Sequence, residues 1–442
     1  MGLEPRPERA AAPGVPARAA ATELLFGVLD RKRPLDQLLE PGGIALYDSL
    51  PARDRRLAYA IAVTALRRHG EVDALLGRLI ERRPRRAGRL YRVLEVAAAQ
   101  LLFMDVPDHA AVSIALEQLA ADSEAVHFKG LANAVLRRMA RERETLLAGL
   151  DPRLNAPAWL SERWALAYGE ETASRIAAAH LGEPPLDLTV KGDAEGWAAK
   201  LGGIVLPTGG VRLIPSGPID ELPGYGDGEW WVQDAAAALP ARVLGDVGGK
   251  RVADLCAAPG GKTAQLAAAG AEVTAVDISA HRLTRLKQNL ARLRLKAETV
   301  TADVLAWSPP APFDAILLDA PCTATGTIRR HPDVPWLKQP GDAAKLARLQ
   351  AAMLARAATW LKPGGTLVYC TCSLEPEEGE AEVPVAEAAG LRVKPIAARE
   401  IGGLAEAITE RGFVRTLPFQ LAGPDPRLSG LDGFFIARLE KP

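Results

Sequence analysis

The sequence predicts a multidomain protein with an all-α N-terminal domain, a small α+β middle module and a C-terminal doubly wound α/β domain. Three observations support this fold class. The 442 residues exceed what one ordinary hydrophobic core holds, apolar residues recur at helical spacing in the first third, and strands alternate with helices after residue 245. The predicted ranges are 1–20 for a disordered tail, 21–147 for the helical domain, 148–245 for the middle module and 246–442 for the α/β domain.

The first twenty residues are rich in proline, alanine and charge without periodicity, which predicts the tail. Between 21 and 147, apolar pairs such as Leu24/Leu25 and Val28/Leu29 recur four residues apart, as on one face of a helix. Proline and glycine in "EPGG" and "DVPD" are typical of helix ends. The segment is therefore predicted to fold as several helices.

The stretch "DPRLNAPAW" breaks the helical pattern at the start of the middle module. A short helical segment then runs through Trp164 and Ile176, and "PPLDLTV" is rich in strand-forming residues. Glycine-rich turns and short apolar runs fill residues 182–230, which predicts a small α+β module or connector.

After Gly245 the order of elements indicates right-handed βαβ units around a mostly parallel sheet, a Rossmann-like domain. Helices are expected from Lys262, from Ala280 and near 342–361. Strands are expected at "RVADLC", "EVTAVD", "AETVTAD", "FDAILLDA" and "GTLVYCTCS". Ligands of such sheets bind beyond the carboxyl ends of the strands, so the site is expected there.

Composition excludes some classes of protein and leaves one question open. The formal net charge is zero, but residues 51–100 carry twelve arginines against five acidic residues, a segment that suits either a phosphate backbone or a solvated helical face. Four cysteines form no disulfide framework, and no apolar run reaches the roughly 18 residues of a membrane span. We expect a cytoplasmic protein without a membrane partner or a metal; the oligomeric state stays open.

The loop "DLCAAPGGKT" leads from a strand into a helix, and Gly260 and Gly261 let a ligand approach the backbone closely. A P-loop is excluded because Cys256 stands where it needs glycine, and no G-x-G-x-x-G passes through the turn. Asp277 and Asp303 end the next two strands, where carboxylates suit an adenosine-bearing ligand without phosphates; capping of the following helices is the alternative.

Three of the four cysteines are predicted to meet at one edge of the sheet. One strand delivers Asp319 and Cys322 there, and the next delivers Cys370 and Cys372. Too few histidines stand nearby for zinc, while burial as a small apolar side chain suits Cys256 and Cys370.

These motifs resemble the RsmB/Sun-type branch of the RNA cytosine-5 methyltransferase family, bacterial small-subunit 16S rRNA enzymes. The matching text is "DLCAAPGGKT", "VDIS", "DAPCTATGTIRRHPDVPWL", "YCTCSLEPEEGE" and "LDGFFIARL". The resemblance covers nearly the whole chain, because "DHAAVSIALEQLA" and "FKGLANAVLRRM" in the helical segment resemble the NusB-type RNA-binding domain of that branch.

The resemblance implies S-adenosylmethionine as cofactor and RNA, most of all rRNA, as partner. It assigns Cys372 as the nucleophile that adds to carbon six of a cytosine, Cys322 as the thiol that assists release, and Asp319 as the acid at N3. Lys262 or Arg329 is expected to favour the thiolate. The implied cofactor contacts are Cys256, Ala257, Ala258, Pro259, Gly260, Gly261, Lys262, Asp277, Asp303 and Asp319.

Four positions depart from the family pattern. Cys370 is an extra thiol beside the expected nucleophile. Thr323 and Ala324 replace the usual serine and glycine after Cys322, and Phe419 stands where relatives often have histidine. Two rival functions are a tRNA cytosine-5 methyltransferase and a NusB-like RNA-binding factor without catalysis. The intact cysteines argue against the second.

Overall fold

The computed structural model describes residues 14–215 and 217–442, which form two compact units. The first, the helical unit, runs to Glu162 and includes His331–Leu337. The second, the α/β unit, comprises Arg163–Arg330 and Lys338–Pro442. The predicted middle module, 148–245, is thus divided between the two, and the division falls within α10 (Ala158–Tyr168).

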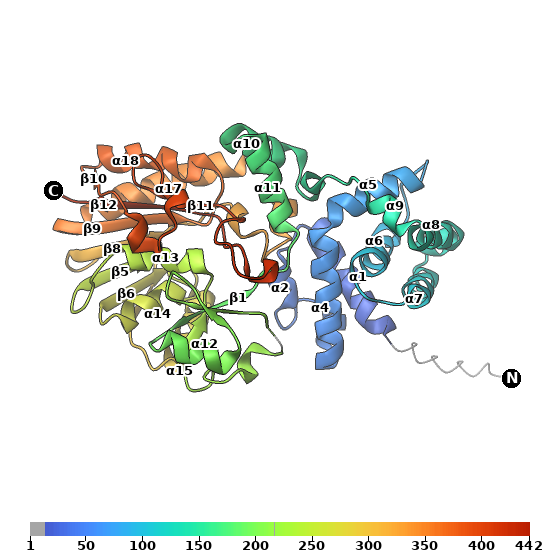
Figure 1. Ribbon diagram of the computed structural model, residues 1–442, viewed down its shortest axis with the longest axis horizontal. Helices are drawn as coiled ribbons and strands as arrows, with labels where there is room; N and C mark the ends of the chain where they lie inside the picture. Colours follow the sequence, from blue (N-terminus) through green and yellow to red (C-terminus); the bar gives the residue numbers. More distant parts are fainter. Residues whose placement is uncertain (1–13, 216) are drawn as a thin grey trace. The chain divides into compact units, whose positions relative to one another are not determined.

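The helical unit confirms the predicted all-α fold (Figure 1). Its interior is filled by leucine, alanine and valine, and the predicted periodic positions Leu24, Leu25 and Val28 are fully buried. Its helices are α1 (Val15–Leu29), α2 (Leu35–Leu39), α3 (Ala45–Asp48), α4 (Ala52–Arg67), α5 (His69–Leu79), α6 (Leu90–Phe103), α7 (Asp108–Ala121), α8 (Lys129–Arg141) and α9 (Arg143–Leu147).

The predicted tail, 1–20, is corrected at its end. Helix α1 begins at Val15, and Ala17, Ala20 and Ala21 are completely buried. Pro16 lies in the first turn, where a missing N–H breaks no helical hydrogen bond, and alanine is the strongest helix former. The proline- and alanine-rich composition of this segment therefore did not indicate that a helix begins there. Residues 1–13 lie outside the described part of the chain.

One short segment of the C-terminal half of the sequence, His331–Leu337, belongs to the helical unit. It contains α16 (Val334–Leu337). Trp336 donates from Nε1 to the Leu66 carbonyl at 3.2 Å and meets the His69 ring edge-on at 4.5 Å, while Asp333 Oδ2 accepts from Leu35 N at 2.9 Å. The "HPDVPWL" text that follows Arg330 is thus built into the helical core.

The α/β unit begins with the C-terminal part of α10, followed by α11 (Glu170–His180) and a small antiparallel sheet of order β2–β3–β1–β4, in which α12 connects β1 to β2. This confirms the α+β character predicted from "PPLDLTV". The buried Arg212 side chain donates to both Asp187 carboxylate oxygens, at 2.6 and 2.7 Å, and so joins β1 to β3. The bounds are β1 (Leu186–Val190), α12 (Ala194–Leu201), β2 (Ile204–Val205), β3 (Val211–Leu213) and β4 (Trp230–Val232).

The larger sheet has the order β10–β12–β9–β8–β5–β6–β7, with β11 paired to β12 (Figure 1). Its parallel strands are β5 (Arg251–Leu255), β6 (Glu272–Asp277), β7 (Glu298–Thr301), β8 (Phe313–Asp319) and β9 (Leu361–Thr371). β10 (Arg392–Val393), β11 (Val414–Thr416) and β12 (Phe434–Glu440) add an antiparallel edge. The predicted doubly wound fold is confirmed.

Apolar clusters cover both faces of this sheet. One cluster involves α13 (Ala235–Val243) and α14 (Gly261–Ala268), and the other involves α17 (Asp342–Thr359) and α18 (Val383–Ala388); α15 (Ala280–Arg292) packs beside β6. The strand order reverses at β5, which lies between β6 and β8, and a ligand crevice is expected at such a reversal. Within the described residues, no helix has the length and apolarity of a membrane span.

Candidate active site

The loop between β5 and α14 turns sharply at the reversal point. Cys256 has a φ of 61° and Gly260 one of 102°, both in the left-handed region. A Cβ at Gly260 would stand 2.8 Å from Leu286 Cγ, which explains the glycine. α14 therefore begins at Gly261 with its first N–H groups free of helical partners at the carboxyl edge of the sheet.

Asp277 is the last residue of β6 and Asp303 lies two residues after β7, as predicted, and each makes local hydrogen bonds. Asp277 accepts from Ser279 N at 2.9 Å and from Ala258 N at 3.1 Å, so it joins the end of β6 to the loop after β5. Asp303 Oδ1 accepts from Leu305 N at 2.9 Å. Neither carboxylate caps a helix, because the N-cap of α15 is Ser279 and the hydrogen bonds of Asp277 and Asp303 order local turns. Their role in cofactor binding stays a prediction.

Asp254, in β5, is fully buried and accepts from Thr263 Oγ1 at 2.5 Å, while its Oδ1 has no hydrogen-bond partner. Burial raises the pKa of Asp254 to about 7. A carboxyl with a higher pKa in the folded state than in the unfolded state loses stabilising proton binding as the pH rises between the two values.

This shift predicts a pH-dependent effect of Asp254→Asn. Relative to wild type, the variant should gain about 3 kcal/mol of unfolding free energy between pH 4 and pH 8, because asparagine carries no charge to bury. Denaturant titrations at both pH values measure the difference. Glu272→Gln, at the exposed start of β6, is the control and should give a profile parallel to that of wild type; a parallel profile for Asp254→Asn would contradict the prediction.

Lys262 and Asp319 form an ion pair, with Lys262 Nζ 2.8 Å from Asp319 Oδ2. Burial alone would lower the pKa of Lys262, but the Asp319 carboxylate outweighs it and the net shift is upward, so the ammonium stays charged. The Cys370 thiol donates to the other oxygen, Oδ1, at 3.5 Å. Asp319 is therefore held from two sides at the end of β8 and remains about one-third exposed.

The Cys322 and Cys372 sulfurs lie 3.5 Å apart. Cys372 directly follows β9, and Cys322 lies three residues after β8, so two neighbouring parallel strands deliver the two thiols. Both side chains are half-buried, whereas Cys370 is fully buried. The hydrogen bond to Cys372 and burial raise the pKa of the Cys322 thiol, and burial raises the pKa of Cys370 as well as that of Cys256, the latter to about 12.

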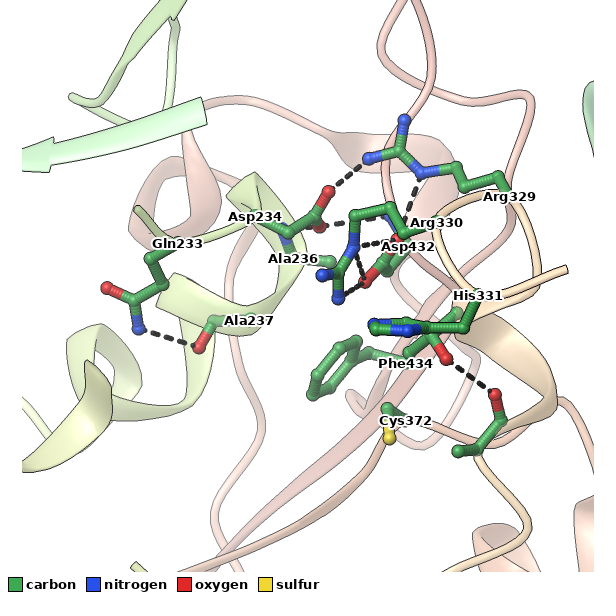
Figure 2. A network of polar contacts seen from close by, with 12 residues as sticks. Gln233, Asp234, Ala236, Ala237, Arg329, Arg330, His331, Cys372, Asp432 and Phe434 are labelled. Atoms are coloured by element: carbon green, nitrogen blue, oxygen red, sulfur yellow. Dashed lines mark hydrogen bonds and ion pairs between the residues drawn. The ribbon is translucent and has the colours of Figure 1, made fainter. Parts of the chain in front are cut away.

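The cationic partner proposed for the nucleophile needs one correction. The Arg329 guanidinium is buried and forms ion pairs with Asp234 and with Asp432, the second at 2.9 Å (Figure 2). Arg329 therefore stabilises the fold and is not the cation that favours the Cys372 thiolate. Its neighbour Arg330 pairs with Asp432 and is one-third exposed. Burial lowers the pKa of Arg330, but Asp432 and Cys372 raise it more. Cys372 contributes to the raised pKa of Lys262 as well as to that of Arg330.

Sequence reasoning missed Asp234, Asp432 and Arg330. Asp432 N donates to Asp234 Oδ1 at 3.0 Å, and Asp432 accepts from both arginines, so the network ties the loop after β8 to the segments before α13 and β12 (Figure 2). The "LDGFF" and "IRR" motifs contained the signal, since both were part of the family resemblance. The sequence alone, however, does not show that Asp432 pairs with Arg329 and Arg330, which lie about a hundred positions away.

The departures from the family pattern have local explanations. The Thr323 hydroxyl lies 3.0 Å from Ser373 Oγ and donates to Glu378, a role that serine fills equally well. The Phe419 ring stacks under the Arg175 guanidinium at 3.8 Å. Ala324 has a φ of 59°, in the region that glycine occupies without strain.

Ala324→Gly is therefore expected to stabilise the α/β unit by about 0.5 to 1 kcal/mol, because it removes the left-handed penalty on alanine while loosening the unfolded chain. Denaturant titration measures this change. Ala352→Gly, at an exposed position of α17, is the control and should destabilise the protein by about 1 kcal/mol. Destabilisation by both changes would contradict the strain at Ala324.

Within residues 14–215 and 217–442, no group of three or more His, Cys, Asp or Glu side chains is arranged to hold a metal ion.

Family models match both halves of the chain. Residues 241–440 match the 16S rRNA methyltransferase RsmB/F model, and residues 15–141 match the NusB family. Among curated proteins, the ribosomal RNA small subunit methyltransferase B of Salmonella arizonae is 36% identical over 96% of this chain and 98% of its own length. That of Cronobacter sakazakii is 35% identical over the same shares.

Solved structures agree with this fold. The crystal structure of PH0851 has a TM-score of 0.73, at 23% identity, and covers 98% of this chain and all of that one. A methyltransferase homolog protein from Pyrococcus horikoshii has a TM-score of 0.54 at 29% identity, covering 66% of this chain and 98% of its own. With a full-length relative at 36% identity and both domain models matched, the chain belongs to the RsmB/F family of RNA methyltransferases, in the form that carries a NusB-family domain.

Proposed function

We propose that this enzyme methylates carbon five of a cytosine in small-subunit rRNA, with S-adenosylmethionine as methyl donor and Cys372 as a transient covalent nucleophile. The observation that carries the proposal is the 3.5 Å contact between the Cys322 and Cys372 sulfurs. Asp319 ends the strand beside them, in register with Cys370. A pair of thiols next to an acid is what addition to a pyrimidine and later release require.

The residues around the β5 turn fit the cofactor. We assign the carboxylates of Asp277 and Asp303 to the ribose hydroxyls and the first N–H groups of α14 to the cofactor's other polar atoms. Asp277 also holds the loop 256–261 through Ala258 N, and the acidic edge suits a sulfonium cation rather than a phosphate. When bound, the cofactor supplies an electrophilic methyl group. The proposed contacts are Cys256, Ala257, Ala258, Pro259, Gly260, Gly261, Lys262, Asp277, Asp303 and Asp319.

The protein groups divide the reaction between them. Cys372 adds as a thiolate to carbon six of the cytosine, which makes carbon five nucleophilic. Asp319, a carboxylate fixed by Lys262, takes up the proton that the Cys372 thiol gives up, passes it to N3 as the adduct forms and takes it back later. Cys322, acting as a thiolate, or a water then takes the carbon-five proton. The electrons of that bond re-form the double bond between carbons five and six, and Cys372 leaves carbon six as a thiolate, with Cys322 close enough to assist.

The target base must leave its stack to reach a thiol at the edge of a sheet. We assign the helical domain, 21–147, to RNA binding, and the catalytic step to 246–442. The NusB-family match and the names of the 36%-identical relatives support rRNA over tRNA as the substrate. We also place the enzyme in the cytoplasm, where a reducing environment would keep its four free cysteines reduced.

The test is transfer of labelled methyl from S-adenosylmethionine to separate rRNA and tRNA pools, followed by nucleoside analysis. We expect 5-methylcytosine in small-subunit rRNA. Label in tRNA alone would contradict rRNA as the substrate, and label in another nucleoside would contradict methylation at carbon five of cytosine. RNA binding without any transfer to free or partly assembled rRNA would favour the rival, a binding factor without catalysis.

The arginine-rich segment of the helical unit gives a further prediction. Arg82, Arg85 and Arg86 are exposed in the loop between α5 and α6, whereas Arg83 pairs with Asp73 at 2.7 Å. If the three exposed arginines contact phosphates, their joint replacement by glutamine should lower the slope of log affinity against log salt by about 2 to 3. Glu81→Gln is the neighbouring control; an unchanged slope in the triple variant would indicate a solvated face.

A further inference from the structure

Glu378 is a fully buried carboxylate in the turn after β9. Its oxygens accept from Thr323 N at 2.9 Å, from Ser373 Oγ at 2.6 Å, from Gln350 Nε2 at 3.1 Å and from Thr323 Oγ1. These donors come from the loop after β8, the loop after β9 and α17. A buried carboxylate with four donors is stable only while all of them stay in place, so Glu378 joins these three elements.

The donors occupy equivalent positions relative to the two thiols. Thr323 directly follows Cys322, and Ser373 directly follows Cys372. The same glutamate is also tied to β9 through its own carbonyl, which accepts from Tyr369 OH and Thr371 Oγ1, each at 2.9 Å. The Glu378 side chain therefore binds the residue that follows each of the two thiols.

From this arrangement we infer that Glu378 is a positioning residue that sets the distance between the Cys322 and Cys372 sulfurs. The inference rests on the proposed function for its catalytic consequence, because it matters only if Cys322 assists release of the Cys372 adduct. Without Glu378 the two loops lose their shared anchor. Cys372 can still reach carbon six from the end of its own strand, whereas Cys322 no longer lies beside it.

The reaction should therefore fail at release rather than at addition. Glu378→Ala is expected to accumulate the covalent enzyme–RNA adduct and to lower turnover at least tenfold, with a smaller change in KM. Glu378→Gln keeps the shape and one acceptor, and the hydroxyls of Thr323 and Ser373 can rotate to accept from its amide. It should restore most of the release.

A second readout reports the thiol geometry without any catalysis. Sulfurs in contact at 3.5 Å need only a small movement to form a disulfide of about 2.0 Å. The rate at which diamide links Cys322 to Cys372 in the RNA-free, full-length protein, followed by peptide mapping, therefore measures their alignment. We expect this rate to fall at least tenfold in Glu378→Ala and less in Glu378→Gln.

The matched control is Glu382→Gln. Glu382 is also buried and follows in the next turn, yet its Oε2 has no hydrogen-bond partner. Its disulfide rate and its adduct level should equal those of wild type. If Glu378→Ala folds and links its cysteines at the wild-type rate, the inference is wrong. If Glu378→Ala does not fold, Ser373→Ala decides by the same readout, with at least a threefold slower rate expected and an unchanged rate overturning the role.

The two proposals fail separately. Slower disulfide formation together with no methyl transfer by the wild-type enzyme would leave Glu378 as the anchor of the thiol pair and overturn the proposed function. Normal methyl transfer by the wild-type enzyme together with an unchanged disulfide rate in Glu378→Ala would keep the proposed function and overturn the role of Glu378.

Discussion

Replacing Cys372 with alanine is expected to lower methyl transfer to RNA at least about 10⁴-fold, because carbon five of cytosine is a poor nucleophile until a thiolate adds to carbon six. The thiol is half-buried at the end of β9, so its loss should leave the fold intact. Single-turnover transfer of labelled methyl measures the effect.

Two controls accompany this prediction. Thermal unfolding and RNA binding of Cys372→Ala should match those of wild type, which separates loss of chemistry from loss of structure. Turnover equal to that of the wild-type enzyme would exclude Cys372 as the nucleophile and would turn attention to Cys322, the other half-buried thiol of the pair.

The second large effect is expected from Cys322→Ala. The variant keeps Cys372 and Asp319, so addition and methyl transfer can proceed, but the thiol placed 3.5 Å from the adduct sulfur is gone. Enzyme should therefore remain bound to RNA through a bond that survives denaturing electrophoresis. We expect most of the active enzyme to be trapped after one turnover.

The control is the double variant with both cysteines changed to alanine, which should form no such complex. Multiple turnovers by Cys322→Ala without any denaturant-resistant complex would show that release does not need this thiol. A complex that persists in the double variant would assign the covalent bond to another residue.

Much of the fold could be predicted because its signals are local. Helical spacing around Leu24 and Leu25, and the strand that ends at Asp319, lie within a few residues of sequence. The edge that gathers Cys322, Cys370 and Cys372 follows from the rule that parallel strands end on one side.

The rest depends on contacts between distant residues. Nothing near Asp432 in the sequence points to Arg329 and Arg330, and nothing in "HPDVPWL" indicates that Trp336 packs against His69 in the helical unit. The tail boundary was missed for a different reason. Low-complexity composition and a good helix start look alike when the apolar residues are alanines, as they are before Leu24.

The central claim is that Cys372 carries the covalent bond to RNA, and peptide mapping of the trapped complex tests it most directly. Cys322→Ala would be incubated with rRNA and S-adenosylmethionine, digested with nuclease and protease, and analysed by mass spectrometry. The account predicts a nucleotide attached to Cys372 in the peptide that contains "YCTCSLEP". Attachment to Cys370 or Cys256, or 5-methylcytosine formed with no attached peptide at all, would contradict it.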